Sequence, residues 1–297
     1  MVAATARPMK AAAFDYVRAV QLEHALELLE LHGGDARLIA GGQSLVPMMA
    51  MRLARPTLLV DINRIASLQS VSAGVAALSM GACVCQRDVE DSDALAAQLP
   101  LMHQALRWVG HQQTRNRGTV GGSLAYADPS AELPLVALVL GATMQLQSRR
   151  DGVRRVAAQD FFLGPMATAI GETECLTSVD WPVWQGARIA SAFDETAIRH
   201  GDFAMASAAC QLQLDLQGTV VRASLGLGGV GGAPMVFPAL ARQMLGQTMT
   251  AAVALQVAHD AARETEPSSD MHASADYRRH LAQVLLSRVL LQAGVSA

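Results

Sequence analysis

The chain has 297 residues, of which 51% are hydrophobic and 16% are charged, and its net charge is −3. This length suits one large domain or two to three small subdomains, and the apolar content is too high for a disordered chain. The small negative charge gives no electrostatic reason to expect nucleic acid or an anionic membrane as a partner.

No apolar run approaches the roughly 18 residues of a membrane-spanning helix, so we expect no membrane span. Residues 1–10 contain no apolar core of a signal peptide, so we expect no secretory signal. The four cysteines are too few for a disulfide framework and lack the spacing of zinc or iron–sulfur ligands: Cys83, Cys85, Cys175 and Cys210. We therefore expect packed thiols in a chain that works in the reducing cytoplasm.

The first half of the chain alternates between helical and strand-like patterns. Apolar residues recur at helical spacing over residues 20–31, and Gly33-Gly34 follows as a C-terminal cap. Further helices are expected over residues 45–53, 89–99, 101–109 and 131–140. Strands are expected over residues 37–40, 57–61, 76–85, 142–148, 153–157 and 176–181, and 142–148 and 153–157 should form a hairpin.

The last third changes character. Residues 206–216 and 220–227 are predicted to be antiparallel strands, followed by a glycine-rich turn at 228–234. Helices are then expected over residues 238–245, 250–263 and 275–293. This change places a domain boundary near Pro182. We expect a first domain over residues 1–182, with subdomains of about 1–60 and 61–182, and a second domain over residues 183–297.

Two glycine pairs are the most informative local features. Gly41-Gly42 lies between an expected strand and an expected helix that Ser44 could cap, and Gly121-Gly122 lies in a loop over residues 117–123. Neither matches a P-loop or the dinucleotide fingerprint. Adjacent glycines let the backbone approach an anion closely and turn several N–H groups toward it. Two such loops could hold the two phosphates of a diphosphate, or both could be ordinary turns.

Four motifs resemble those of a known family in their order and spacing. They are residues 39–47 (IAGGQSLVP), 116–132 (NRGTVGGSLAYADPSAE), 199–204 (RHGDFA) and 274–281 (SADYRRHL). Together they resemble the flavoprotein subunits of molybdenum hydroxylases, the family that includes the medium subunit of carbon monoxide dehydrogenase and the FAD domain of xanthine dehydrogenase.

This resemblance implies an α+β fold like that of the vanillyl-alcohol oxidase flavoproteins. Two α+β subdomains would cradle FAD, and a C-terminal domain of antiparallel sheet and helices would close over it. The chain would pass electrons from the [2Fe–2S] clusters of a small partner subunit through FAD to an external acceptor. Substrate would be oxidised at a molybdopterin cofactor in a large partner subunit, in a dimer of heterotrimers. No His or Cys attachment motif is visible, so FAD should be noncovalent.

The resemblance also implies the contacts with FAD. The diphosphate would be wrapped by Ala40, Gly41, Gly42, Gln43, Ser44, Thr119, Val120, Gly121, Gly122 and Ser123. Asp128 would reach the ribityl or ribose hydroxyls, and Leu176 would lie near the flavin ring. Some relatives carry His where this chain has Gln43, and they often carry His where it has Tyr126. Phe193 is the nearest match for an aromatic residue over the isoalloxazine. No residue of this chain is expected to be catalytic or to bind a metal.

Other residues have competing interpretations. Arg115 and Arg117 could face the diphosphate, a partner or solvent. Packing or surface roles are favoured over acid–base chemistry for His103 and His111. The acidic run Asp88, Glu90, Asp91 and Asp93 is more typical of a solvated helix start than of a metal site, and the methionines Met48, Met49 and Met51 are more typical of core.

Two alternative functions stay open. A self-sufficient flavin oxidase on the same fold would need a general base over the flavin, and the sequence does not identify one. A non-catalytic assembly subunit that has lost flavin is disfavoured by the intact glycine pairs.

Overall fold

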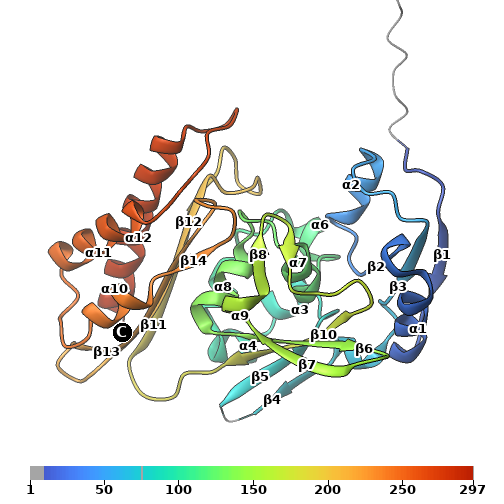
Figure 1. The fold of residues 1–297 in the computed structure, drawn as a ribbon. Coiled ribbons are helices and arrows are strands. Elements are labelled where there is room, and N and C mark those ends of the chain that lie inside the picture. Colours follow the sequence, from blue (N-terminus) through green and yellow to red (C-terminus); the bar gives the residue numbers. More distant parts are fainter. Residues whose placement is uncertain (1–9, 75, 297) are drawn as a thin grey trace, which may run out of the picture.

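The computed structural model describes residues 10–74 and 76–296. The expectation drawn from residues 1–10 therefore lies almost entirely outside the described residues. Three larger sheets follow one another along the chain, besides a two-stranded sheet in the central part, with the N-terminal part at one end of the molecule and the last helices at the other (Figure 1). The mixture of helices and sheets confirms the α+β prediction.

The N-terminal part is built on a parallel sheet of order β1-β3-β2. Its strands are β1 (Asp15–Arg18), β2 (Ala36–Ile39) and β3 (Leu58–Asp61). Helix α1 (Leu22–His32) buries Ala25, Leu26 and Leu29, which share one face at helical spacing. Gly33, at φ +50°, ends this helix as predicted, because glycine tolerates a positive φ. A short 3-10 helix (Gly33–Asp35) follows, and helix α2 (Leu45–Ala50) comes directly after the first glycine pair.

The central part contains an antiparallel sheet of order β4-β5-β10-β6-β7. These strands are β4 (Val71–Ala73), β5 (Ala77–Gly81), β6 (Thr143–Ser148), β7 (Gly152–Ala157) and β10 (Cys175–Pro182), and β6 with β7 confirms the predicted hairpin. The remaining elements here are a 3-10 helix (Ala66–Gln69), α3 (Gln86–Glu90), α4 (Asp93–Gln98), α5 (Pro100–Leu106), α6 (Gln112–Arg115), α7 (Val120–Tyr126), α8 (Glu132–Leu140), α9 (Ala158–Phe161), β8 (Phe162–Gly164) and β9 (Ala167–Thr168). The expected strand over 76–85 is shorter, and the expected helix over 89–99 is divided between α3 and α4.

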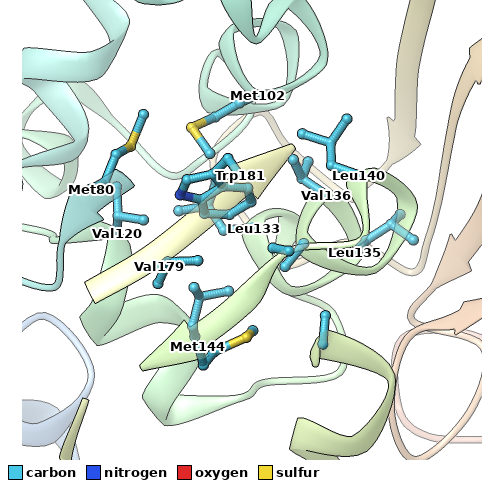
Figure 2. Packing of buried hydrophobic residues seen from close by; sticks show 14 of the residues in the cluster. Met80, Met102, Val120, Leu133, Leu135, Val136, Leu140, Met144, Val179 and Trp181 are labelled. Carbon is cyan, nitrogen blue, oxygen red and sulfur yellow. The ribbon is translucent and has the colours of Figure 1, made fainter. Parts of the chain in front are cut away.

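Helix α8 lies at the centre of the molecule. It is buried nearly all round, and its residues pack with Trp181 of β10 in the largest hydrophobic core. Figure 2 shows Trp181 among Met102, Val120, Leu133 and other apolar side chains of this core. Because α7 ends just before α8 and packs on β10, this core also fixes the second glycine pair, which lies in α7.

The C-terminal part is an antiparallel sheet of order β11-β12-β13-β14, with β12 and β13 paired as predicted. Its elements are β11 (Ile189–Thr196), β12 (Ala206–Leu214), β13 (Val220–Gly228), β14 (Met235–Val236), α10 (Pro238–Gln243), α11 (Ala251–Arg263) and α12 (Ala275–Ser296). Helix α12 packs on β11 and β12, whereas α5 and α8 contact the same strands from the central part (Figure 1). Within residues 10–74 and 76–296, no helix is long and apolar enough to cross a membrane.

Candidate functional site

The two glycine motifs meet in space. Strand β2 leads into Gly41, and Gly42, at φ +73°, turns the chain toward α2. A Cβ added at Gly41 would collide with the carbonyl oxygen of Arg117 and would lie 2.9 Å from the Cα of Gly118. The backbones of the two motifs are therefore in direct contact, and only glycine fits at position 41.

The first motif presents an open row of backbone donors. Asn63 holds it in place by donating from Nδ2 to the carbonyl oxygen of Ala40 at 2.8 Å. From Gly41 to Ser44, four consecutive N–H groups find no acceptor among the described residues. Ser44 precedes α2 but makes no side-chain cap, so its hydroxyl is also uncommitted. Such a row of free amides suits an anion.

The second motif is built differently from the expected loop, because its two glycines lie in the first turn of α7. Thr119 caps this helix and accepts a hydrogen bond from the N–H of Gly122 at 3.0 Å. The N–H groups of Val120 and Gly121 donate to the carbonyl oxygens of Val84 and Ala82, each at 2.9 Å. Thr119 is the one residue of 117–123 whose N–H lacks an acceptor among the described residues.

Gly121 allows α7 to pack closely against the chain after β5, and its N–H group is not free to bind an anion. A Cβ at this position would lie 2.6 Å from the Cα of Ala82, so the helix can approach the chain after β5 only through glycine. The expectation that both glycine pairs turn several N–H groups outward therefore holds for the first motif alone.

A pocket of about 310 Å³ lies beside the contact between the motifs. Its lining is mostly polar and comes from the chain after β3, the chain after β5 and the approach to α7. The lining residues are Asn63, Gln69, Cys83, Val84, Cys85, Asp88, Asn116, Arg117 and Thr119. Arg117 and Thr119 belong to the second motif, so the pocket borders the site that the two motifs form.

Arg115 shapes the approach to the second motif. Its guanidinium binds Glu90 through two hydrogen bonds, of 2.7 and 3.0 Å, and also donates to the carbonyl oxygens of Val109 and Gly110. Both side chains of the ion pair are largely buried. Arg115 therefore faces neither solvent nor an open diphosphate site, and Glu90 is not part of a solvated acidic run. Among the residues that the structure describes, no group of three or more potential ligands could hold a metal.

Three acidic side chains gather beyond the end of α7. Asp128 follows the left-handed residue Ala127, and its Oδ1 accepts from the N–H of Ser130 at 2.9 Å. Glu132 begins α8 and Glu195 lies on β11, and they are only 6% and 5% exposed. Burial raises the pKa of Asp128, raises that of Glu132 to about 7, and, with the negative charge of Glu132, raises that of Glu195 to about 9. No sequence pattern pointed to Glu195, which lies on β11 of the C-terminal sheet.

The loop after β11 rests against the residues before α6. A Cβ at Gly201, at φ +87°, would lie 2.7 Å from the imidazole of His111, and the rings of His111 and His200 are 6.3 Å apart. Phe203 on this loop is 66% exposed. Phe193, the aromatic residue predicted to cover the flavin, is instead only 6% exposed and packs in the central core.

The remaining predicted residues lie deeper in the molecule. Leu176 is buried in β10, opposite Leu146, in the core on which α7 packs. The buried cysteines are Cys83, Cys175 and Cys210, and burial raises the pKa of each thiol to about 12. Of the three methionines expected in the core, Met49 is buried and Met51 is exposed.

Comparison with known families explains this arrangement. Residues 12–184 match the FAD binding domain in molybdopterin dehydrogenase, and residues 191–293 match the CO dehydrogenase flavoprotein C-terminal domain. The fold and the paired glycine motifs thus define an FAD-binding oxidoreductase subunit. The chain belongs to the family of FAD-binding flavoprotein subunits of molybdenum hydroxylases, as its motifs predicted.

Individual relatives match over nearly their whole length. The alpha subunit of the 6-hydroxypseudooxynicotine dehydrogenase complex of Paenarthrobacter nicotinovorans is 37% identical, over 96% of this chain and 96% of its own. Quinoline 2-oxidoreductase from Pseudomonas putida 86 has a chain with a TM-score of 0.91 and 37% identity, covering 96% of this chain and 98% of its own. Carbon monoxide dehydrogenase from Hydrogenophaga pseudoflava, lacking the Mo-pyranopterin moiety of its cofactor, gives a TM-score of 0.93 at 31% identity, covering 97% and 99%. These similarities confirm the predicted fold class.

The Arg115–Glu90 pair yields a stability prediction. Glu90→Gln keeps the shape of the side chain but leaves the Arg115 charge largely buried without a counter-ion, which should cost about 3 kcal/mol. Asp91→Asn is the matched control, because it removes the exposed pair with Arg87 and should cost less than about 0.5 kcal/mol. Urea unfolding followed by circular dichroism measures both. Equal losses in the two variants would contradict the structural role given to Glu90.

Proposed function

We propose that this chain is the electron-transfer flavoprotein of a multi-subunit molybdenum hydroxylase. It would bind FAD without a covalent bond, accept electrons from [2Fe–2S] clusters of a small partner subunit and pass them to an external acceptor. The observation that carries the proposal is the backbone contact of Gly41 with Arg117 and Gly118, beside four uncommitted N–H groups. A diphosphate needs two closely spaced anion sites. The two motifs are in backbone contact, so their free N–H groups could supply such sites side by side.

The residues of this chain would bind and orient the cofactor, which supplies the redox chemistry when it is bound. The diphosphate is proposed to lie against residues 40–44 and 119–123, with most amide donors coming from the first motif. Thr119 adds one free N–H, while Gly121 and Gly122 let α7 lie close to the chain after β5. Asp128 is proposed to accept hydrogen bonds from ribityl or ribose hydroxyls, and Leu176 to support the flavin ring from the core.

The aromatic contact is reassigned within this proposal. Because Phe193 is packed inside the core, its ring cannot cover a flavin without rearrangement of the core. Phe203 is exposed on the loop that rests against His111, close to the approach to α7. We therefore propose Phe203 as the aromatic residue that covers the isoalloxazine.

The proposal extends to domains, partners and compartment. We place the boundary near Pro182, so that residues 1–182 bind FAD in two subdomains that divide near residue 60, and residues 183–297 close over it. The partners are an iron–sulfur small subunit and a molybdenum-binding large subunit, in a cytoplasmic dimer of heterotrimers. Support comes from relatives that are themselves a complex subunit or a medium chain.

A flavin oxidase working alone is the second candidate. Glu132, with its pKa raised to about 7, is the one new observation that favours it, since a buried carboxyl titrating near neutrality can act as a general base. However, both Glu132 and Glu195 are enclosed, and neither lines the pocket beside the motifs. Substrate turnover by the isolated chain would decide for this candidate.

Noncovalent FAD is the first testable consequence. Purified holoprotein should carry about one FAD per chain, and acid precipitation should release the yellow colour into the supernatant. An absorption spectrum of both fractions measures this. Colour that stays with the pellet would indicate covalent attachment, and a colourless protein that cannot be reconstituted with FAD would refute the proposal.

Gly42→Val should abolish tight FAD binding. Its φ of +73° is strained for a branched side chain, and its Cβ would lie 3.2 Å from Cγ2 of Val46 and 3.5 Å from Cδ1 of Ile39, so the turn that carries the free N–H groups would have to shift. We expect the FAD dissociation constant to rise at least about tenfold, or roughly 1.4 kcal/mol. Gly122→Val should act similarly, because its Cβ would lie 2.7 Å from Thr119 Oγ1 and disrupt the cap of α7.

Gly246→Val is the matched control for Gly42→Val. It has a similar φ of +79° and open space around it, so it should lose about 1–2 kcal/mol of stability through backbone strain and keep its FAD. Fluorescence titration with FAD measures the three variants. Unchanged affinity in both Gly42→Val and Gly122→Val would remove the motifs from the binding site.

Assembly with partner chains is the third consequence. A tagged chain purified from its native cells should bring down an iron–sulfur chain and a molybdenum chain in equal amounts, with iron and molybdenum detectable by elemental analysis. The isolated chain should show no hydroxylase activity, because in this proposal the substrate is oxidised at the molybdenum cofactor of the large partner subunit. A chain that elutes alone, without these metals, and still oxidises a substrate would support the flavin oxidase instead.

A further inference from the structure

Glu132 and Glu195 are buried near enough to interact electrostatically, where the central part meets the C-terminal sheet. Glu132 is contributed by the first turn of α8, and Glu195 by β11. Both side chains are buried, and the negative charge of Glu132 acts on Glu195. Two buried acidic groups from different parts of the chain therefore interact with one another.

Among the described residues, neither Glu132 nor Glu195 forms an ion pair. Glu195 Oε2 is buried without a hydrogen-bond partner among the described residues, and so is the hydroxyl of Ser207, which lies opposite Glu195 in the β11–β12 register. Asp128 adds negative charge near Glu132, and Asp194 adds it near Glu195.

The cations that reach this region are already committed to other carboxylates. Arg115, from α6, acts on Glu132 but is bound to Glu90, and Arg288, from α12, binds Asp194 at 2.7 Å. Two enclosed carboxylates without a free cation cannot both stay ionised at an acceptable cost.

We propose that Glu195 and Glu132 hold one proton between them just above neutral pH, with Glu195 as the protonated member, and that this pair titrates together with the charge of the bound cofactor. The second half rests on the proposed function. Asp128 and Glu132 follow directly after α7, whose first turn carries the second glycine motif and which spans about 10 Å. Asp128 and Glu132 therefore lie within the reach of an FAD molecule that is bound at that motif.

The chemistry of the reaction gives the pair a role. A one-electron donor such as an iron–sulfur cluster delivers electrons without protons, whereas full reduction of a flavin takes up at least one proton per two electrons. That proton must come from solvent or from the protein. A shared proton next to the site can respond to the added negative charge, and by linkage the charge on the cofactor must alter the proton affinity of the pair. Glu195 acts through Glu132, so it is a positioning residue.

Linkage also fixes the direction of the pH effect on stability. The pKa of Glu195 is raised from 4.5 to about 9 in the folded chain, so the folded state keeps a proton that the unfolded state releases. The free energy of unfolding that Glu195 contributes is therefore lost progressively as the pH rises from 4.5, its ordinary pKa, to about 9, its pKa in the folded chain. Glu195→Gln carries no charge at any pH, so its melting temperature should rise relative to the parent chain across this window.

The test compares the full-length holoprotein with Glu195→Gln and with Glu266→Gln, an exposed control. Infrared spectroscopy at about pH 8, between the pKa values of Glu132 and Glu195, should detect a protonated carboxyl in the parent chain and in the control, and the band should be missing from Glu195→Gln. The midpoint potential of the flavin, measured against pH, should show an inflection between neutrality and about pH 9 in the parent chain and the control only. A missing band, or the same inflection in all three proteins, would overturn the inference.

Two further results separate this inference from the proposed function. If Glu195→Gln does not fold, the parent chain labelled with carbon-13 glutamate is titrated instead, and its glutamic acid band must disappear near pH 9 rather than near 4.5. If the parent chain binds no FAD, the proposed function fails and the link to the cofactor fails with it. The infrared measurement on the same chain still decides whether the proton is shared.

Discussion

The Cα of Gly41 lies against the carbonyl oxygen of Arg117 and the Cα of Gly118, with no room for a side chain between the two segments. This contact joins the end of a parallel strand in the N-terminal part to the approach to α7 in the central part. It also sets the direction in which the chain leaves β2, because Gly42 must then turn through a positive φ to begin α2. The open N–H groups of the first motif exist because this turn follows neither strand nor helix geometry.

The rest of the structure holds the two sides of this contact in position. Asn63 fixes the first motif from the end of β3, and the segment over 82–86 fixes the second through backbone hydrogen bonds. Below them, α7 and α8 are anchored in the core around Trp181. The same α8 carries Glu132 to the C-terminal sheet, so the proposed cofactor site and the buried acidic pair are connected through one buried helix.

Some of these features could be predicted from the sequence and others could not. Regular apolar spacing predicted α1, and glycine at its end predicted the cap, because both signals are local. The hairpin β6–β7 and the pair β12–β13 were predicted for the same reason. Helix α7 was missed, because its two glycines disfavour a helix, and the Thr119 cap together with packing against Ala82, β10 and α8 stabilises it. Strand β11 was missed because Ala, Ser, Asp and Glu give little strand signal, and pairing with β12 decides its conformation.

At the site, the two motifs could be recognised from the sequence. The sequence could not show that the first motif supplies most of the free N–H groups and the second serves mainly for close packing. Which N–H groups stay open depends on the backbone of residues 82–86, which no local pattern connects to residues 117–123. Hydrogen–deuterium exchange of the full chain with and without FAD shows directly whether both motifs bind the cofactor. We expect FAD to slow exchange at residues 41–44 and at Thr119 together, while the already bonded amides of Val120 and Gly121 change little. Protection at only one motif, or at neither, would contradict it.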